Sequence, residues 1–294
     1  MKVAVTGAGG FIGRNLLREL TKNGHEIIAL YHRHSPFPDL VKGMTWVKTD
    51  IHDIDSLKTS LNGAVAVYHL VGIIAETRTL TFEKTVIGGT RKLVEACRSV
   101  GIKKIIYLSA LGTSSSAASK YLHAKWLAEE SIRNSGLNYV ILRPSIVFGP
   151  EDKFINRLAR MIRLYPVMPI IGDGHQKIQP IFVNDLTTIL RNSLSNDKAL
   201  NRTIQIGGPE EYEFRQLITL LKKLLKKRSI NLYIPLWTLK IIAAGLEKIM
   251  KPAPFTTDQL KMLKAGNTCD NSELLELFNM ELTRLEDGLE KYLR

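Results

Sequence analysis

A glycine-rich segment near the start of the chain restricts the possible folds more than any other feature of this sequence. The apolar run Lys2–Thr6 leads directly into Gly7-Ala8-Gly9-Gly10-Phe11-Ile12-Gly13, where a helical pattern begins. Gly7 permits a tight turn, Gly10 lets a pyrophosphate approach the backbone, and Gly13 lets the helix pack closely on the sheet. The order of strand, loop and helix predicts a dinucleotide-binding loop.

Strand-length apolar runs alternate with helix-period segments through the first half of the chain. The predicted strands are Lys2–Thr6, Glu26–Leu30, Thr45–Thr49, Ala64–Leu70, Lys104–Leu108 and Tyr139–Arg143, and the predicted helices are Phe11–Asn23, Ile54–Leu61, Phe82–Val100 and Ser119–Ser135. Several strands are continuous apolar runs, as in strands covered on both faces. We therefore expect an α/β fold with a Rossmann-type doubly wound parallel sheet.

Beyond Pro150, closely spaced prolines and glycines divide the chain into shorter pieces. The helices predicted there are Phe154–Leu164, Val183–Leu194, Tyr212–Lys227 and Leu236–Met250. This pattern predicts a dinucleotide-binding domain over residues 1–150 and a smaller, mostly helical lobe for substrate or partner over residues 151–294. We expect the two to be interleaved near residues 175–210.

Composition limits the classes of partner and compartment. The net charge of +13 favours anionic partners, but the sequence has no nucleic-acid recognition motif, so we expect no nucleic acid. Cys97 and Cys269 lie far apart, which predicts a reducing compartment and no metal site. Because the first predicted strand starts at Lys2, we expect no leader, and no apolar stretch approaches the roughly 20 residues of a membrane span. We expect a cytoplasmic protein, or one peripheral to the inner face of a membrane.

The residues after the second predicted strand indicate which dinucleotide is bound. An NAD site usually has Asp or Glu there to hold the ribose hydroxyl, whereas this chain has Tyr31-His32-Arg33-His34. His32 and Arg33 suit the 2′-phosphate of NADP, so NADP is preferred over NAD, although a solvated basic loop has the same composition. Asp50 ends the third strand, where it would accept from the adenine amino group or cap a helix.

Tyr121 and Lys125 form a candidate acid–base pair. Their spacing of four residues places both on one face of a helix. A nearby ammonium stabilises phenolate, so it lowers a tyrosine pKa of about 10 toward the range of proton transfer. The pair follows the strand Lys104–Leu108 and its terminal Ser109. We expect the hydroxyl of Ser109 to orient a substrate carbonyl. The alternative is an ordinary helix surface.

Eight segments carry a resemblance to a known superfamily. They are TGAGGFIG at 6–13, KTDIHD at 48–53, VYHLVG at 67–72, GGTRKLVEAC at 88–97, IIYLSALG at 105–112, SKYLHAK at 119–125, LRPSIVFGPED at 142–152 and GDGHQKIQPIFVNDL at 172–186. The chain resembles the extended and atypical short-chain dehydrogenases/reductases, which are NAD(P)-dependent epimerase/dehydratase-like proteins. It is most similar to the branch that contains the nucleotide-binding accessory subunit of respiratory complex I.

The resemblance implies a set of contacts to the cofactor and the substrate. Gly7, Gly10, Phe11, Ile12 and Gly13 would hold the pyrophosphate, and Asp50 and Ile51 would flank adenine. Leu70, Val71 and Gly72 would line the adenosine and ribose, Tyr121 and Lys125 would lie beside the nicotinamide ribose, and Pro144, Ser145, Ile146 and Val147 would approach the carboxamide. Asp185 would lie near the substrate lobe.

Two functions are consistent with these residues. The first is an NADP(H)-dependent oxidoreductase, epimerase or dehydratase that acts on a small carbonyl or alcohol through Tyr121, Lys125 and Ser109. Many extended members place the catalytic hydroxyl one residue later, where this chain has Ala110, and Thr113 or Ser114 would then have to substitute. The alternative is a non-catalytic NADPH-binding structural or sensing subunit that docks on a membrane-associated complex.

Basic helices in the second half of the chain suggest where such docking would occur. Lys222, Lys223, Lys226, Lys227 and Arg228 form one basic face, and the apolar, aromatic segment Leu236–Ile242 follows. Together they predict contact with an anionic membrane surface or with a partner such as a respiratory complex. A core helix behind a solvated face is the other interpretation.

Overall fold

The computed structural model describes residues 1–32, 43–250, 253, 255–264 and 266–293, and its centre is a parallel sheet. Seven strands lie in the order β11-β6-β5-β4-β1-β2-β3, and every neighbouring pair is parallel. Their bounds are β1 Lys2–Thr6, β2 Glu26–Tyr31, β3 Met44–Lys48, β4 Ala66–His69, β5 Lys104–Leu108, β6 Asn138–Pro144 and β11 Arg202–Ile206. The chain order reverses beside β1, where ligands bind in doubly wound sheets.

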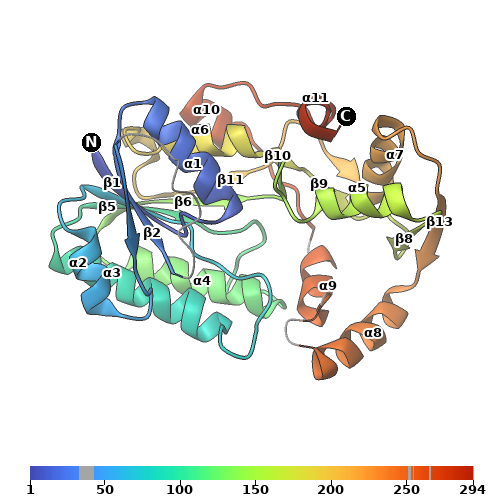
Figure 1. Ribbon diagram of the computed structural model, residues 1–294, viewed down its shortest axis with the longest axis horizontal. Coiled ribbons are helices and arrows are strands. Elements are labelled where there is room, and N and C mark those ends of the chain that lie inside the picture. Colours follow the sequence, from blue (N-terminus) through green and yellow to red (C-terminus); the bar gives the residue numbers. More distant parts are fainter. Residues whose placement is uncertain (33–42, 251–252, 254, 265, 294) are drawn as a thin grey trace.

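Helices cover both faces of this sheet, which explains why its central strands are mostly apolar (Figure 1). One face carries α1 Phe11–Lys22, α6 Val183–Asn192 and α10 Ser272–Phe278; the other carries α2 Ile54–Leu61, α3 Gly89–Ser99 and α4 Lys120–Arg133. A π-helical segment, Phe82–Gly88, leads into α3. The predicted Rossmann-type sheet is confirmed. The predicted single helix Phe82–Val100 is instead two differently wound segments.

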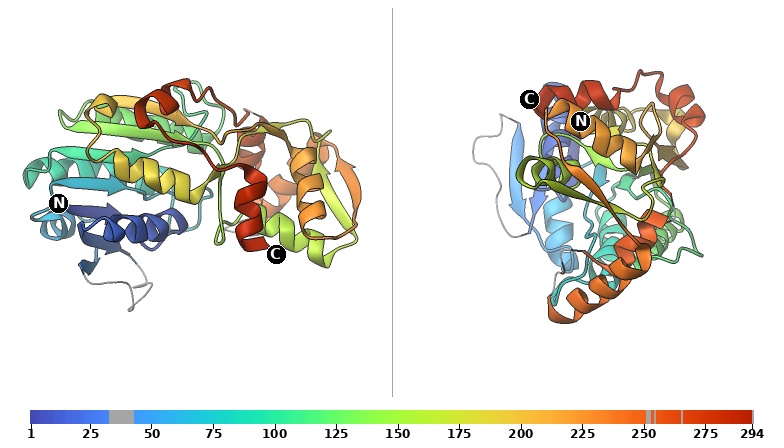
Figure 2. Two further views of the ribbon diagram at one scale, coloured as in Figure 1. Left: turned by 90° about the horizontal axis from the view of Figure 1, so that it is seen from above. Right: turned by 90° about the vertical axis from the view of Figure 1, so that its right-hand side faces the viewer.

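A smaller lobe lies beyond the carboxyl ends of the strands (Figure 2). Its helices are α5 Ile155–Leu164, α7 Phe214–Leu224, α8 Leu236–Ile249, α9 Thr257–Lys264 and α11 Leu285–Leu293, and its longer strands are β8 Val167–Ile171 and β13 Ile230–Ile234. Shorter strands are β7 Val147–Phe148, β9 Lys177–Ile178, β10 Ile181–Phe182 and β12 Tyr212–Glu213, and a short 3-10 helix spans Asp197–Ala199. A separate apolar core fills this lobe.

The chain crosses between the two parts several times. After entering the lobe it returns as α6 and β11, and later as α10, which packs on β11. The edge strand β11 and the pair β8–β13 were absent from the elements expected from the sequence. The helix expected over Tyr212–Lys227 is shorter, because Tyr212 and Glu213 pair as a strand with β9 before α7 begins. Among the described residues, no helix is both long and apolar enough to span a membrane.

We predict that the C-terminal helix α11 tolerates no side chain at Gly288. A Cβ there would lie 2.7 Å from the fully buried ring of Phe148, so Gly288→Ala should lower the free energy of unfolding by about 1–3 kcal/mol. The matched control is Gly245→Ala in α8, where a Cβ meets nothing within 4 Å. That change should raise stability by about 0.5–1 kcal/mol. Urea unfolding of both variants measures the difference, and equal effects would contradict the packing argument.

Candidate active site

The glycine loop between β1 and α1 is held by contacts that leave no space for side chains. Gly7 has a φ of +71°, and a Cβ there would lie 3.0 Å from the backbone of Leu70. A Cβ on Gly13 would lie 2.4 Å from the carbonyl oxygen of Gly7. No side chain caps α1 at Gly10, so the first-turn amides around Phe11 and Ile12 are available to a phosphate.

A buried histidine supports this loop from below. His69 ends β4, and its ring lies between the hydroxyls of Thr6 (2.8 Å from Nδ1) and Thr90 (2.9 Å from Nε2). Thr90 donates its proton to the carbonyl of Val86 at 2.5 Å, so it accepts from Nε2–H, and Nδ1 accepts from Thr6. Burial lowers the pKa of His69 to about 3, so this ring stays neutral. It ties β1, β4 and α3 together at the loop.

The residues expected to flank adenine lie beside the ends of β2 and β3. Asp50 accepts a hydrogen bond from the amide of His52 at 2.9 Å, and the imidazole of His32 lies 3.9 Å from the same carboxylate. Ile51 packs on Gly89, where a Cβ would be 2.9 Å from its side chain. The contact explains the second glycine of the pair before Thr90. Arg33, predicted to bind a 2′-phosphate, lies outside the described residues.

Lys125 is held against strand β5. Its ammonium donates to the carbonyl of Leu108 at 2.8 Å and lies 4.7 Å from the centre of the Tyr107 ring. A Cβ on Gly72 would come within 3.4 Å of the Lys125 nitrogen, so the segment after β4 closes over this side chain. Burial lowers the pKa of Lys125 to about 7, although the carboxylate of Glu129 opposes that change.

Tyr121 lies one turn earlier on α4 and is also buried, with its ring against Phe82 at 5.8 Å between centroids. Burial raises the pKa of Tyr121 to about 12. Two adjacent groups that both favour their neutral forms are a poor acid–base pair at neutral pH without a further charge. A cation bound beside Tyr121, such as an oxidised nicotinamide ring, is the kind of charge that favours phenolate.

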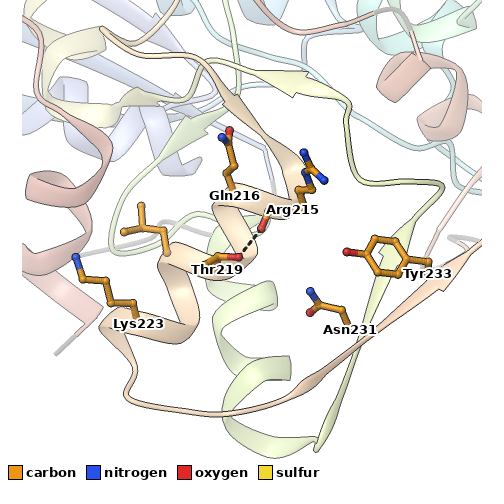
Figure 3. Close-up of a pocket in the computed structure, with 7 residues that line it drawn as sticks. Arg215, Gln216, Thr219, Lys223, Asn231 and Tyr233 are labelled. Atoms are coloured by element: carbon orange, nitrogen blue, oxygen red, sulfur yellow. Dashed lines mark hydrogen bonds between the residues drawn. The ribbon is translucent and has the colours of Figure 1, made fainter.

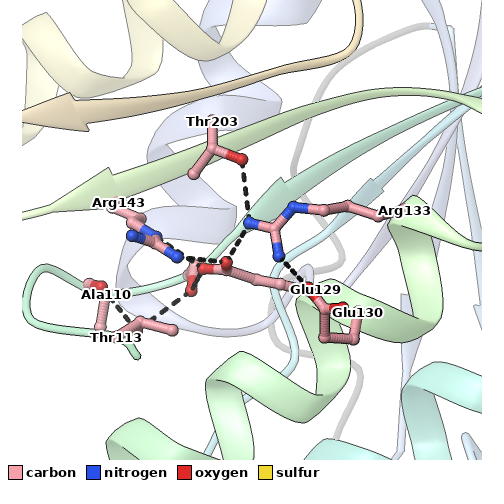
Figure 4. A network of polar contacts seen from close by, with 8 residues as sticks. Ala110, Thr113, Glu129, Glu130, Arg133, Arg143 and Thr203 are labelled. Carbon is pink, nitrogen blue, oxygen red and sulfur yellow. Dashed lines mark hydrogen bonds and ion pairs between the residues drawn. The ribbon is translucent and has the colours of Figure 1, made fainter. Parts of the chain in front are cut away.

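The hydroxyl of Ser109 is bound within a buried ion network. It donates to Glu129 at 2.5 Å, and Glu129 has no exposed surface. The same carboxylate accepts two hydrogen bonds from Arg143 and one from Arg133 (Figure 4). Glu129 was not expected from the sequence, although it continues the four-residue spacing of Tyr121 and Lys125 along α4.

Thr113, one of the two residues expected to substitute for the hydroxyl missing at Ala110, is also constrained. Thr113 donates to the carbonyl of Ala110 at 2.7 Å and lies 3.5 Å from Ser109 (Figure 4). Ala110 has no hydroxyl. The arrangement therefore keeps Tyr121 and Lys125 but engages the neighbouring hydroxyls of Ser109 and Thr113 in internal hydrogen bonds.

The turn that follows β6 is fastened by a residue from the C-terminal region. Asn267 accepts from the amide of Ile146 at 2.8 Å and from the hydroxyl of Ser145. The carbonyl of Ile146 accepts from Ile181 at 2.9 Å, and Val147 begins β7 directly after Ser145 and Ile146. The segment from Pro144 to Val147 therefore has little freedom to move. Asn267 was missed by the sequence analysis, because nothing in its local sequence indicates this long-range contact.

The N-terminus of α4 receives a carboxylate from α9. Asp258 accepts from the hydroxyl of Ser119 and the amide of Lys120, both at 2.7 Å, and from the amide of Tyr121 at 3.1 Å. An acidic side chain at this end of a helix satisfies free amides and interacts well with the helix dipole. Asp258 thus fixes the start of the helix that carries Tyr121 and Lys125.

Two further acidic residues, Asp185 and Glu151, bind partners from other segments of the chain. Asp185, expected near the substrate lobe, accepts from the amide and the hydroxyl of Thr283 at 2.7 and 2.9 Å. Glu151 forms ion pairs with Arg14 and Arg18 on the first turns of α1, beside the glycine loop. Within the part of the chain that the structure describes, no group of three His, Cys, Asp or Glu side chains is arranged to hold a metal.

Comparison with known proteins identifies one family model, the NAD dependent epimerase/dehydratase family, which matches residues 3–207. The chain is 30% identical over 259 residues to NADH dehydrogenase (ubiquinone) 1 alpha subcomplex subunit 9, mitochondrial, of Arabidopsis thaliana; the alignment covers 85% of this chain and 64% of that protein. It is 27% identical to the 2-alkyl-3-oxoalkanoate reductase of Stenotrophomonas maltophilia, over 63% of this chain and 62% of the reductase.

A solved structure with the same fold is the UDP-glucuronic acid 4-epimerase of Bacillus cereus in complex with UDP-glucuronic acid and NAD. It superposes with a TM-score of 0.78 at 24% identity, covering 100% of this chain and 98% of the epimerase. The chain thus spans less than two thirds of the Arabidopsis and Stenotrophomonas relatives but matches the fold of this epimerase along its whole length.

We predict a pH-dependent stability that comes from Lys125. Its folded-state pKa of about 7 lies below its ordinary 10.5, so between these values the unfolded chain binds a proton that the folded chain lacks. Without nucleotide, the free energy of unfolding should therefore rise with pH from 7 to 9, by at most about 1.4 kcal/mol per pH unit. Lys125→Met should lack this rise.

The measurement is urea unfolding at several pH values, compared as a difference between the two proteins. The exposed Lys103 provides a control, because Lys103→Met should keep the wild-type pH profile. Parallel profiles for wild type and Lys125→Met would show that Lys125 remains charged when buried.

We also predict that Asp258 holds the start of α4. Asp258→Asn should increase amide hydrogen exchange at Lys120 and Tyr121 about fivefold, which corresponds to the ~1 kcal/mol typical of a charged cap. Asp270→Asn is the matched control, because Asp270 accepts from Ser272 at the start of α10, away from α4. Unchanged exchange at α4 in Asp258→Asn would refute the capping role.

Proposed function

Because the chain belongs to the NAD dependent epimerase/dehydratase family, we propose that it binds NADP(H) in the crevice beside β1 and retains it with little turnover. The close packing of Gly7 and Gly13 supports the binding site, since it leaves the amides at the start of α1 facing a space where backbone can approach phosphates. Any activity of the relatives is only proposed for this chain, because each alignment covers only part of those proteins.

The preference for NADP over NAD rests on the end of β2. Tyr31 ends the strand and His32 follows it, so the position that carries a carboxylate in many NAD sites has none. Asp50, the nearby carboxylate, is already engaged by the amide of His52. In this proposal Arg33 reaches the 2′-phosphate, and the guanidinium supplies both charge and paired donors. The epimerase from Bacillus cereus contains NAD, so the fold alone does not select the phosphate.

The cofactor would follow the line of residues expected from the sequence. In the proposed complex the adenine ring lies by Asp50 and Ile51, and the ribose lies by Leu70, Val71 and Gly72. Tyr121 and Lys125 lie by the nicotinamide ribose, and the turn from Pro144 to Val147 lies by the carboxamide. When bound, NADPH supplies a hydride; Tyr121 is then the group placed to supply the proton that a reduced carbonyl oxygen requires.

Low turnover is proposed from one observation, the hydrogen bond from Ser109 to Glu129. A hydroxyl that donates to a buried carboxylate held by two arginines would have to give up that bond to donate to a substrate carbonyl. Ala110 has no hydroxyl and Thr113 donates to a backbone carbonyl, so of the substitutes that the sequence offers only Ser114 remains. The site therefore favours holding the nucleotide over polarising a substrate.

A slow reductase is the second candidate, and the intact pair of Tyr121 and Lys125 favours it. Both side chains lie on the buried face of α4, and Lys125 is fixed by Leu108 and enclosed by Gly72. The similarity to a 2-alkyl-3-oxoalkanoate reductase supports a carbonyl substrate, whereas the similarity to a complex I subunit supports a bound nucleotide within an assembly. In the reductase, hydride would move to the carbonyl carbon and the Tyr121 proton to its oxygen.

The test is nucleotide binding to the purified chain, with released nucleotide identified first. We predict that NADPH binds at least about tenfold more tightly than NADH, in line with a charge-assisted contact of 1.5–3 kcal/mol, and that Arg33→Ala removes most of this difference. Arg98→Ala on the exposed face of α3 removes the same charge elsewhere and should keep the preference. Equal affinities in the wild type would refute the phosphate selectivity.

Turnover is measured on the same preparations with a panel of small ketones and 3-oxoacyl compounds. The proposal expects NADPH to be retained with no oxidation above the uncatalysed rate. A rate that disappears in Tyr121→Phe, while NADPH affinity stays the same, would establish the reductase instead.

A further inference from the structure

The outer face of the small β8–β13 sheet is apolar and exposed. Parallel pairing places Val167 beside Ile230 and Pro169 beside Leu232, with their side chains on the same face. Ile230 is 73% exposed and Leu232 is 54% exposed. The intervening residue Met168 points the other way and is buried in the core of the lobe. β8 therefore buries Met168 and Ile170 on one face, and the face that carries Ile230 and Leu232 is presented to solvent.

Helix α8 extends this apolar surface. It begins at Leu236, two residues after β13 ends, and among its residues Ala243 alone is buried. Trp237, Ile241 and Ile249 recur at intervals of four and eight residues, so they share one side of the helix, and they are 66%, 66% and 82% exposed. α8 also packs on α9. Figure 1 shows β13 at the far end of the small lobe and α8 running back from it, below α9.

The charges around this surface have one sign. From residue 214 to residue 250 the chain has eight lysines and arginines and one acidic residue, Glu247, which is bound to Thr257 of α9. Lys226, Lys227 and Arg228 are exposed directly before Ile230, and Lys240 and Lys248 are exposed on α8. Within the described parts of the chain, no carboxylate lies within ion-pair distance of these five side chains.

A hollow between α7 and β13 adjoins the same end of the lobe (Figure 3). Arg215 and Lys223 line one side of it, and Asn231 and Tyr233 line the other. Arg215 is paired with Glu213 and Lys223 with Glu286, so these two cations are largely neutralised. The attraction for an anionic partner therefore comes from the five exposed cations.

We propose that this end of the small lobe docks on a bilayer that contains anionic phospholipid. The docking face consists of Ile230, Leu232, Trp237, Ile241 and Ile249, with Lys226, Lys227, Arg228, Lys240 and Lys248 at its border. Exposed apolar side chains bordered by lysines, with a tryptophan among them, match the interfacial region of a membrane. A uniformly positive border is complementary to a surface of uniformly negative headgroups.

A bilayer fits this face better than a folded protein partner does. A specific protein interface requires carboxylates or hydrogen-bond partners arranged for individual lysines, and it is centred on well-packed pockets. The docking face instead has exposed cations around an exposed strand and helix, which a fluid surface accommodates. This inference does not depend on the nucleotide site, because none of its residues belongs to that site.

The experiment is co-sedimentation of the full chain with vesicles of phosphatidylcholine alone and vesicles that also contain 30% phosphatidylglycerol. We expect binding to the mixed vesicles, at least about tenfold weaker binding to the neutral ones, and release at high salt. Equal binding to both vesicles would overturn the charge argument. No binding to the mixed vesicles would overturn the proposal.

Two sets of variants locate the contact. Trp237→Ala with Ile241→Ala, and separately Lys226→Gln with Lys227→Gln and Arg228→Gln, should each weaken binding at least about tenfold. The matched controls are Val65→Ala with Leu275→Ala, and Lys84→Gln with Arg91→Gln and Arg98→Gln, which change exposed residues of the other domain. These controls should bind as the wild type does; a loss equal to that of the docking-face variants would overturn the assignment.

Further measurements distinguish a bilayer from a second copy of the chain as the occupant of this face, and they distinguish loss of docking from misfolding. Trp237 fluorescence should shift to shorter wavelength on mixed vesicles, and Trp237→Phe should abolish that shift. Sedimentation velocity without lipid should show a monomer; a dimer that Trp237→Ala disrupts would assign the face to a second copy of the chain and overturn the proposal. NADPH binding by every variant reports folding, so loss of docking with nucleotide binding intact concerns the docking face alone.

Discussion

The approach of Gly13 to the carbonyl of Gly7 is the constraint on which the rest of the structure depends. A Cβ at Gly13 would lie 2.4 Å from that oxygen, so any larger residue would push α1 away from β1. The position of α1 decides where its free amides point, and α1 also packs on α6. The neutral ring of His69, held by Thr6 and Thr90, fixes β1 against β4 and α3 directly beneath the loop. One close contact between two glycines therefore sets both the direction of the free amides of α1 and the packing of that sheet face.

Burial governs the chemistry available to α4. The same face of this helix carries Tyr121, Lys125, Glu129 and Arg133 at successive four-residue steps. Taking Tyr121 and Lys125 out of water favours their neutral forms, and the charge of Glu129 is held by arginines and Ser109. Without a bound ligand the site therefore has little tendency to form phenolate. Both carboxylate oxygens of Glu129 in this ion network already accept hydrogen bonds, so Ser109 would have to give up its bond to Glu129 before it could donate to a substrate.

The sheet and the line of candidate cofactor residues were predictable because they follow local rules. Apolar runs, the loop at Gly7–Gly13 and the spacing of Tyr121 and Lys125 are each visible within a short window of sequence. The strand β11 was not predictable, because Arg202–Ile206 alternates like a surface strand and joins the sheet only after the chain has left for the second lobe. Asn267 and Asp258 were missed for the same reason: each acts more than 100 residues away in sequence, and no local pattern marks such a contact.

Helix α9 contacts both α8 of the docking face and the start of α4. Its Thr257 is held by Glu247 of α8, at 2.7 Å from the amide. The next residue, Asp258, holds the amides of Lys120 and Tyr121 at the start of α4. Two consecutive residues thus join the helix of the docking face to the helix of the candidate active site. Because hydrogen bonds of this kind depend on position within a few tenths of an ångström, α8 and α4 cannot shift independently while both sets of bonds persist. The position of α8, transmitted through α9, therefore helps to hold Tyr121 in place.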